Sequence, residues 1–222
     1  MKRDLLLVAA SGLAREVIEA ANVVGRFQVR GIVDDDDARW GDQVGGTQVI
    51  GGLDALARYP NADIVVCAGK GAVRQQLVAR LLASGIAASR FATVVHPSVQ
   101  LPASAAVGRG SVVLAGCVLT ADVTLGRHVV VMPNVTLTHD VVIADFATLC
   151  AAVTLGGSVH VGERAYVGMA ASVRENCRIG AGSTIGMGSV VLTDVPADEV
   201  WFGVPARPRA NSFSASKERQ YV

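Results

Sequence analysis

The sequence predicts two parts, an N-terminal α/β domain and a C-terminal parallel β-helix, and three observations lead to this prediction. A strict period of six runs through the second half of the 222-residue chain. Strand-like and helix-like segments alternate through residues 1–92. Hydrophobic residues make up 51% of the chain but aromatic residues only 5%, so the core is built from aliphatic side chains, which suit stacked strands.

The period of six is the strongest pattern in the sequence. Every sixth residue from Val95 to Val191 is Val, Ile or Leu, and the residue four places later is always small or β-branched. A helix needs a period near 3.6 and an ordinary strand a period of two, so neither explains the pattern. A coil with three short flat faces does explain it, with positions one and five of each hexad filling the interior.

Glycine often follows the position-one aliphatic residue. These glycines are Gly108, Gly126, Gly156, Gly162, Gly168, Gly180 and Gly186. We expect them to turn the corners of the coil, because glycine adopts a positive φ without steric cost. Successive coils should then stack at strand spacing, about 4.8 Å apart.

The N-terminal pattern resembles half of a doubly wound nucleotide-binding fold. Strands are expected at residues 4–10, 28–33, 62–68 and 91–95, and helices at 14–24 and 72–84. The turn at Ser11 and Gly12 leads from the first strand into a helix, whose free N–H groups and dipole suit a phosphate. The full GxGxxG motif is missing, so a simple tight turn is the alternative interpretation.

An acidic run, Asp34 to Asp37, ends the second expected strand. Acids at this place can accept hydrogen bonds from a ribose or a base. A solvated acidic loop is the alternative.

Charge and cysteine usage exclude several classes of partner and site. The net charge is +1 and Lys and Arg form no block, which argues against nucleic acid or an anionic membrane. The four cysteines form no CxxC pair, and neither a signal peptide nor an 18-residue apolar run is present, so we expect a cytoplasmic protein. The four histidines occupy different hexad positions, so they should not converge on a metal.

Several short motifs together resemble one family, the bacterial nucleotide-sugar and sialic-acid acetyltransferases. Its members include enzymes that acetylate the UDP-4-amino-sugar of bacillosamine synthesis and GDP-perosamine. The motifs are Ser11-Gly12, Val33-Asp34-Asp35, Ala68-Gly69-Lys70 with Arg74, Thr138-His139-Asp140-Val141-Val142-Ile143, Thr193-Asp194-Val195-Pro196 and Gly203-Val204-Pro205-Ala206-Arg207. The resemblance implies a left-handed β-helix, which physics alone would not favour, because parallel crossovers are normally right-handed. It also implies a homotrimer with acetyl-CoA in the groove between neighbouring prisms.

The resemblance also implies residue roles. His139 would be the general base and Asp140 would orient it and raise its basicity. Ser11, Gly12 and Leu13 would lie near the phosphates of a nucleotide-linked amino-sugar, and Asp34, Asp35 and Lys70 near its base and ribose. Thr148, Gly157, Met169 and Met187 would contact acetyl-CoA, and the Gly157 backbone would stabilise an oxyanion.

The chain departs from the family pattern near both expected sites. Leu13 stands where the family usually has a histidine at the end of a glycine-rich turn. Thr148 replaces the family's second histidine, nine residues after the base, and Ala151 replaces a proline.

We therefore predict a nucleotide-sugar-binding domain at residues 1–92, a left-handed β-helix acetyltransferase domain at 93–209 and a polar tail at 210–222. The expected reaction is acetyl transfer from acetyl-CoA to the 4-amino group of a sugar linked to UDP, dTDP or GDP. An O-acetyltransferase acting on sialic acid or a related sugar is the alternative, and a non-catalytic sugar-binding trimer is a more remote one. A nucleotidyltransferase would need a longer N-terminal domain with an arginine-containing phosphate loop.

Overall fold

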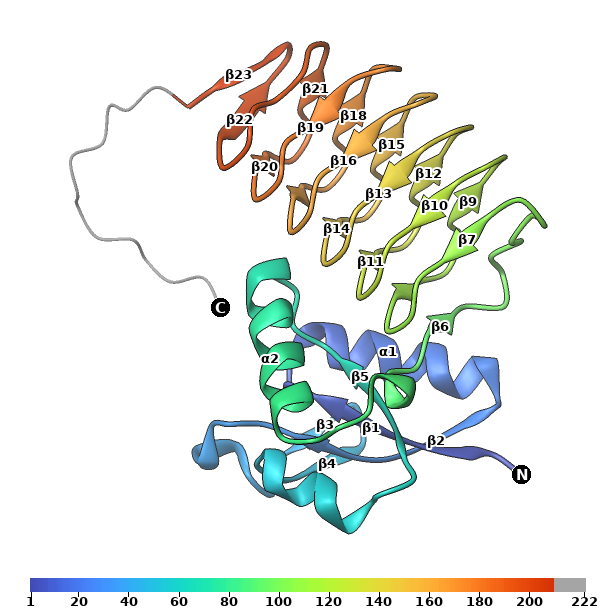
Figure 1. Cartoon of the computed structure of the whole chain (residues 1–222), viewed down its shortest axis with the longest axis vertical. Coiled ribbons are helices and arrows are strands. Elements are labelled where there is room, and N and C mark those ends of the chain that lie inside the picture. The colour runs from blue at the N-terminus through green and yellow to red at the C-terminus, as the bar shows by residue number, and fades with distance from the viewer. Residues whose placement is uncertain (210–222) are drawn as a thin grey trace.

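A five-stranded sheet with two helices forms the N-terminal part of the molecule (Figure 1). A computed structural model describes residues 1–209, so the polar tail predicted at 210–222 lies outside the described residues. The strand order is β3-β4-β2-β1-β5, parallel except for the antiparallel pair β3 and β4. The elements are β1 (Arg3–Val8), α1 (Gly12–Val24), β2 (Phe27–Val33), η1 (Asp37–Arg39), β3 (Gln43–Val44), β4 (Thr47–Gly51), η2 (Leu53–Arg58), β5 (Asp63–Val66), α2 (Gly71–Ala83) and η3 (Ala88–Arg90).

The β3–β4 hairpin is an element that the sequence interpretation missed. Its two-residue turn is Gly45-Gly46, and both residues have positive φ values, 59° and 74°. Such a glycine pair between two short strands is a hairpin signal, because the favoured two-residue turns require positive φ. The hairpin places β4 beside β2 and so widens the sheet.

The remaining strands form a left-handed β-helix whose coils stack in parallel into a three-sided prism. Face A is the eight-stranded sheet of β6 (Val94–Val95), β8 (Val112–Val113), β11 (Val130–Val131), β14 (Thr148–Leu149), β17 (Tyr166–Val167), β20 (Thr184–Ile185), β22 (Val200–Gly203) and β23 (Ala206–Pro208). Face B consists of β9 (Val118–Leu119), β12 (Thr136–Leu137), β15 (Thr154–Leu155), β18 (Ser172–Val173) and β21 (Val190–Val191). Face C consists of β7 (Ala106–Val107), β10 (Thr124–Leu125), β13 (Val142–Ile143), β16 (His160–Val161) and β19 (Arg178–Ile179).

The hexad pattern explains the interior of the prism. From Val113 to Val191 every position-one residue is buried, and the position-five residues pack between them in one continuous core. Before Val113 the burial is incomplete: Val95 and Val107 are partly buried, and Leu101 is 43% exposed, because no strand forms between β6 and β7. The division at residue 92 stays a prediction; it falls just before β6, the first strand of face A.

The corner glycines are required for a different reason than expected. Positive φ occurs at hexad position four, where most residues are not glycine; Asn134 and Ala170, for example, have φ values of 61° and 55°. The position-two glycines instead lie against the next coil. A Cβ on Gly162 would come within 2.5 Å of the Ala181 backbone nitrogen. Close approach of stacked corners, and not a left-handed backbone, therefore excludes side chains at these positions.

Face A is covered by the N-terminal part, and Arg74 joins the two. Helix α1 packs near β6, and the apolar core on this side of the sheet includes Val112 and Val130 of face A. Arg74 of α2 is fully buried, and its guanidinium donates to the carbonyl oxygens of Ala68, His128 and Phe146 at 2.5, 2.7 and 2.7 Å. Burial lowers the pKa of Arg74 to about 10.

His128 is buried in this junction, with only 6% of its surface exposed. Its ring stacks on Phe146, with centroids 5.1 Å apart, and meets Phe91 edge-on at 4.8 Å. Burial, and then the positive charge of Arg74, lower the pKa of His128 to about 4. The ring is therefore neutral at pH 7 and acts as part of the interdomain core.

Candidate active site

His139 and Asp140 form a hydrogen-bonded pair at the corner between faces B and C. The Nδ1 atom of His139 lies 2.8 Å from an Asp140 carboxylate oxygen, and both side chains are exposed. Asp140 has a positive φ of 60°, the position-four corner conformation that turns its side chain back toward its neighbour. This arrangement leaves Nε2 as the nitrogen available to exchange a proton with a ligand.

Gly157 lies directly beneath the His139 ring, one coil further on. A Cβ at this position would come within 2.5 Å of Nε2, so only glycine leaves the ring where it is. The two residues are also joined by the backbone, because the Ser158 N–H donates to the His139 carbonyl at 2.9 Å. The structure therefore brings together three of the residues selected from the sequence.

Face B is a flat strip of small side chains bounded by this corner. Its outward residues include Thr136, Thr154 and Ser172, and the Thr154 hydroxyl donates to the Ser172 hydroxyl at 2.9 Å. Met169 and Met187 border the opposite edge of the strip on consecutive coils, 51% and 72% exposed. An extended, partly apolar ligand can therefore lie along face B between the two methionines and His139.

The second group of selected residues lies at the carboxyl edge of the N-terminal sheet. Ser11 caps α1: its hydroxyl accepts from the Ala14 N–H at 3.1 Å and donates to the Cys67 carbonyl at 2.6 Å. Gly12 is exposed, with open space where a Cβ would be, whereas Leu13 is buried in the core. The first N–H groups of a helix have no partner within it, so this turn offers backbone donors to an anion.

Asp34, Asp35 and Lys70 lie at the same edge but differ in availability. The Asp34 carboxylate accepts from the N–H groups of Ala10 and Asp36 at 2.6 and 2.9 Å, which fixes the turn to the end of β2. Asp35 is ion-paired with Arg80 of α2. Lys70 is exposed at the beginning of α2. Ribose or base contacts by the two acids would therefore have to share carboxylates that already have partners.

Arg39 is a residue at this edge that the sequence interpretation missed. It ends η1, and its guanidinium donates to the carbonyl oxygen of Ala10 in the turn before α1. Asp42 is its nearest acid, at 3.8 Å. The available signal was a single cation two residues after the run Asp34 to Asp37, which follows a strand that adjoins the turn.

Thr148 is not part of a ligand surface. Only 3% of it is exposed, and its hydroxyl donates to the Gly69 carbonyl at 2.8 Å and accepts from Arg74 at 3.1 Å. The structure thus separates Thr148 from Gly157, Met169 and Met187, with which it was grouped as an acetyl-CoA contact. Its side chain serves the interdomain junction.

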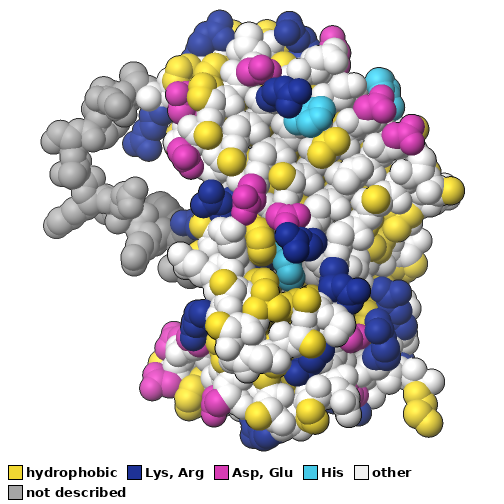
Figure 2. Space-filling view, viewed as in Figure 1, with side chains coloured by type: hydrophobic (Ala, Val, Ile, Leu, Met, Phe, Trp, Pro, Cys, Tyr) yellow, Lys and Arg dark blue, Asp and Glu magenta, His cyan; other side chains and the backbone are white. Residues whose placement is uncertain are grey.

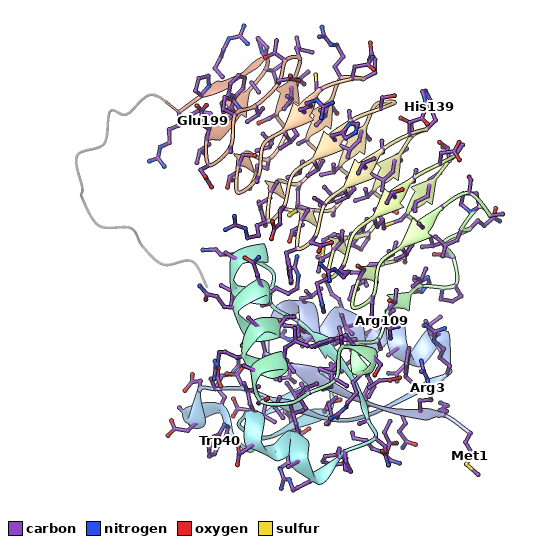
Figure 3. All side chains as sticks on the ribbon, in the orientation of Figure 1. Met1, Arg3, Trp40, Arg109, His139 and Glu199 are labelled. Atoms are coloured by element: carbon purple, nitrogen blue, oxygen red, sulfur yellow. The ribbon has the colours of Figure 1, made fainter. Side chains whose placement is uncertain are left out.

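The two groups of residues face different ways within one chain. The N-terminal part covers face A, whereas His139 lies at the corner between faces B and C, on the far side of the prism (Figure 3). His139 and the carboxyl edge of the N-terminal sheet therefore lie on different sides of the prism within one chain.

Two kinds of feature are absent from residues 1–209. No group of three or more His, Cys, Asp or Glu residues in this part of the chain is arranged to hold a metal ion. None of its helices is both long enough and apolar enough to cross a membrane.

Comparison with known proteins agrees with both parts of the architecture. The PglD N-terminal domain family matches residues 4–81, and the bacterial transferase hexapeptide family (six repeats) matches residues 158–193. No curated protein sequence matches the chain.

Two similar solved structures come from acetyltransferases. PerB from Caulobacter crescentus, solved in complex with CoA and GDP-perosamine, is 31% identical with a TM-score of 0.85, covering 93% of this chain and 97% of that one. The acetyltransferase domain of PglB from Neisseria gonorrhoeae is 31% identical with a TM-score of 0.84, covering 94% and 100% of the two chains. The same domain is also known in complex with acetyl coenzyme A. The resemblance drawn from the sequence motifs is therefore confirmed, and the chain belongs to this family of hexapeptide-repeat sugar N-acetyltransferases, enzymes that depend on acetyl-CoA.

Proposed function

We propose that this enzyme transfers an acetyl group from acetyl-CoA to the 4-amino group of a nucleotide-linked amino-deoxy-sugar. The observation that carries the proposal is the His139–Asp140 pair, exposed at one edge of a face of small side chains. The similar PerB structure, solved with CoA and GDP-perosamine, supports a nucleotide-linked amino-sugar as the acceptor class.

His139 is the general base in this proposal. Its Nε2 atom accepts a proton from the sugar amine while the amine nitrogen attacks the thioester carbonyl carbon. The new C–N bond forms, the C–S bond breaks, and the leaving CoA thiolate takes up the proton that Nε2 received, which regenerates the neutral imidazole. Asp140 accepts a hydrogen bond from Nδ1, which fixes the tautomer and stabilises the imidazolium that forms. The amine attacks directly, so no acyl-enzyme is required.

Acetyl-CoA lies along face B in this proposal. Met169 and Met187 offer apolar surface to its pantetheine arm, and the Gly157 backbone lies beside the reacting carbonyl. Because the side chains of Thr154 and Ser172 are small, an extended chain can approach the backbone of face B closely.

The nucleotide binds at the carboxyl edge of the N-terminal sheet. Backbone donors at Ser11, Gly12 and Leu13 receive the diphosphate, and Arg39 and Lys70 add positive charge there. Leu13 contributes only its backbone, because its side chain is buried. A diphosphate beside the run Asp34 to Asp37 needs such cations, since unshielded acids would repel it.

We further propose a homotrimer with each active site shared between two subunits. The argument is geometric: a sugar held on the N-terminal part of one subunit can meet His139 only from another copy, because its own His139 lies across the prism. The acetyl-CoA groove and the nucleotide edge would then be completed by assembly.

The reaction is tested by mass spectrometry of acetyl transfer. The full chain is incubated with acetyl-CoA and a panel of UDP-, dTDP- and GDP-linked 4-amino-sugars. His139→Ala is assayed in parallel, and Glu175→Ala, two coils further along the same corner, is the matched control. We expect one acceptor to gain an acetyl group with the wild type and Glu175→Ala but not with His139→Ala. Acetylation of a sugar hydroxyl instead would support an O-acetyltransferase, and acetyl transfer by His139→Ala at the wild-type rate would remove the base assignment.

The shared site is tested by subunit mixing. Gly12→Asp places a negative charge at the phosphate turn, where open space accepts the side chain. This variant and His139→Ala should each be inactive alone, but trimers refolded from an equal mixture should regain about a quarter of the wild-type activity, because a quarter of the sites combine two intact halves. No recovery would show that both halves come from one chain.

A further inference from the structure

A charged cleft lies at the junction of the two parts, at the opposite edge of the sheet from the phosphate turn. It has a volume of about 360 Å³. Figure 2 shows Lys and Arg side chains gathered where the N-terminal part meets the first coils, and Figure 3 labels two of them, Arg3 and Arg109. The cleft lies between the beginnings of β1, β2 and β5 and the first complete coil, and its charged lining residues are Arg3, Arg26, Asp63 and Arg109.

The cleft has an excess of positive charge. Arg3 pairs with Asp63 at 3.2 Å, so these two charges offset one another. Arg26 and Arg109 have no carboxylate within ion-pair distance among the described residues. Two positive charges are therefore uncompensated in one cleft of a chain whose net charge is only +1.

The arginines are held in place before any ligand arrives. Arg26 donates to the Thr93 carbonyl at 2.7 Å, and Arg109 donates to the Ser89 carbonyl at 2.9 Å. The guanidinium carbons of Arg3 and Arg26 also lie 5.3 and 4.9 Å from the centroid of the buried Phe27 ring. These contacts use only part of each guanidinium, which leaves N–H donors free in the planar fork that matches phosphate oxygens.

We propose that this cleft is a second anion site that binds a phosphoryl group. A phosphoryl dianion matches the two uncompensated charges, and the site needs nothing from the proposed acetyl transfer. It is distinct from the nucleotide site, because Arg3, Arg26 and Asp63 precede or begin parallel strands whose opposite ends carry Ser11, Asp34 and Lys70. Occupancy would join Arg26 of the N-terminal part to Arg109 of the prism and so stabilise the junction.

The chain offers a matched control for Arg109. Arg127 occupies the same hexad position at the same corner, one coil further on, but its guanidinium already forms two hydrogen bonds to Asp145, at 2.7 and 2.9 Å. Replacing Arg127 therefore removes an exposed arginine of the same kind without removing an uncompensated charge from the cleft.

The test is calorimetric titration of the full chain with inorganic phosphate and, separately, with glucose 1-phosphate at constant ionic strength. We expect saturable binding to the wild type and to Arg127→Gln, and at least tenfold weaker binding to Arg109→Gln and Arg26→Gln. Tighter binding of the sugar phosphate than of inorganic phosphate would identify a phosphorylated metabolite as the occupant, and the reverse would identify the free ion.

A second variant distinguishes phosphate binding in this cleft from phosphate binding at the turn before α1. Gly12→Asp should keep the binding of inorganic phosphate that depends on Arg26 and Arg109, because its change lies at the other edge of the sheet. Loss of binding in Gly12→Asp, equal binding by Arg109→Gln and the wild type, or no binding at all would overturn the proposal. Failure of acetyl transfer would leave these titrations unaffected, so the two proposals fail separately.

Discussion

The position of the His139 ring depends on two neighbours. The Asp140 carboxylate holds Nδ1, and Gly157, which has no side chain, leaves the space that the ring occupies. Gly157→Ala would place a methyl group within 2.5 Å of Nε2, so the ring must move. We expect kcat to fall about a hundredfold, since a displacement near 1 Å of a reacting group can cost that much. Steady-state kinetics would measure it.

The control for this change is Ser158→Ala, whose side chain follows Gly157 at the same corner. It should retain nearly wild-type kcat. If Gly157→Ala also retains wild-type kcat while binding acetyl-CoA normally, the position of the His139 ring does not matter and another group is the base.

Arg39 makes a separate prediction at the residue scale. Its guanidinium lies at the carbonyl of Ala10, beside the donors proposed for the diphosphate. Arg39→Leu should raise KM for the nucleotide-sugar and weaken binding of the nucleoside diphosphate about tenfold, because a hydrogen bond to a charged group contributes about 1.5–3 kcal/mol. KM for acetyl-CoA should not change.

Titration calorimetry with the nucleoside diphosphate checks this without relying on activity. Arg39→Lys should recover part of the affinity, and Arg30→Leu, which breaks the exposed pair with Asp4, should have none of the effect. Equal affinity in Arg39→Leu and wild type would assign diphosphate binding to the turn and Lys70 alone.

At the scale of the coil, stacking excludes a side chain at position two of the hexad but allows one at position four. Gly162→Ala would bring a Cβ within 2.5 Å of the Ala181 backbone, which cannot move without breaking the ladder of the next coil. We expect it to lower the free energy of unfolding by about 3 kcal/mol, as overpacking of a rigid core does.

The matched change is Ala170→Gly at position four. Ala170 already has a φ of 55° and is exposed. Glycine relieves the backbone strain of the folded chain but raises the conformational entropy of the unfolded chain, and the two effects are of similar size. The free energy of unfolding should therefore change by less than about 1 kcal/mol. Urea unfolding of both variants gives the comparison. Little loss from Gly162→Ala together with a clear gain from Ala170→Gly would mean that φ, and not close approach, selects glycine in these coils.

These elements also show what a sequence can and cannot predict. The strands of the prism follow from a local rule that each hexad obeys independently, so all of them except the missing strand at Leu101 were predictable in place and register. The reason for Gly162 was not, because its neighbour Ala181 lies a full coil away and only the stacked structure brings them together. Thr148 was misassigned for the same reason: its partners, Gly69 and Arg74, are distant in sequence.

At the scale of the whole molecule, the interdomain junction combines a buried guanidinium with a neutral imidazole. Arg74 donates to the carbonyl of His128, whose ring fills the space between Phe91 and Phe146. Protonation of His128 would place a second positive charge beside Arg74 in a site with no acid in ion-pair contact among the described residues. The junction should therefore be sensitive to acid.

The sign follows from the pKa of His128, which is about 4 in the folded protein against 6.5 for the ordinary side chain. Below pH 6.5 this histidine is protonated in the unfolded chain but stays neutral in the folded chain, so the free energy of unfolding decreases as the pH falls from 7 toward 4. By pH 5 this one group should remove about 2 kcal/mol per chain. His128→Asn, which tolerates the positive φ of 54° and cannot titrate, should be less stable at pH 7 but lose less between pH 7 and pH 5. Calorimetric unfolding at fixed protein concentration measures both slopes, with His96→Asn as the control expected to follow the wild type. If His128→Asn and wild type lose stability in parallel, the acid sensitivity of the molecule lies outside this junction.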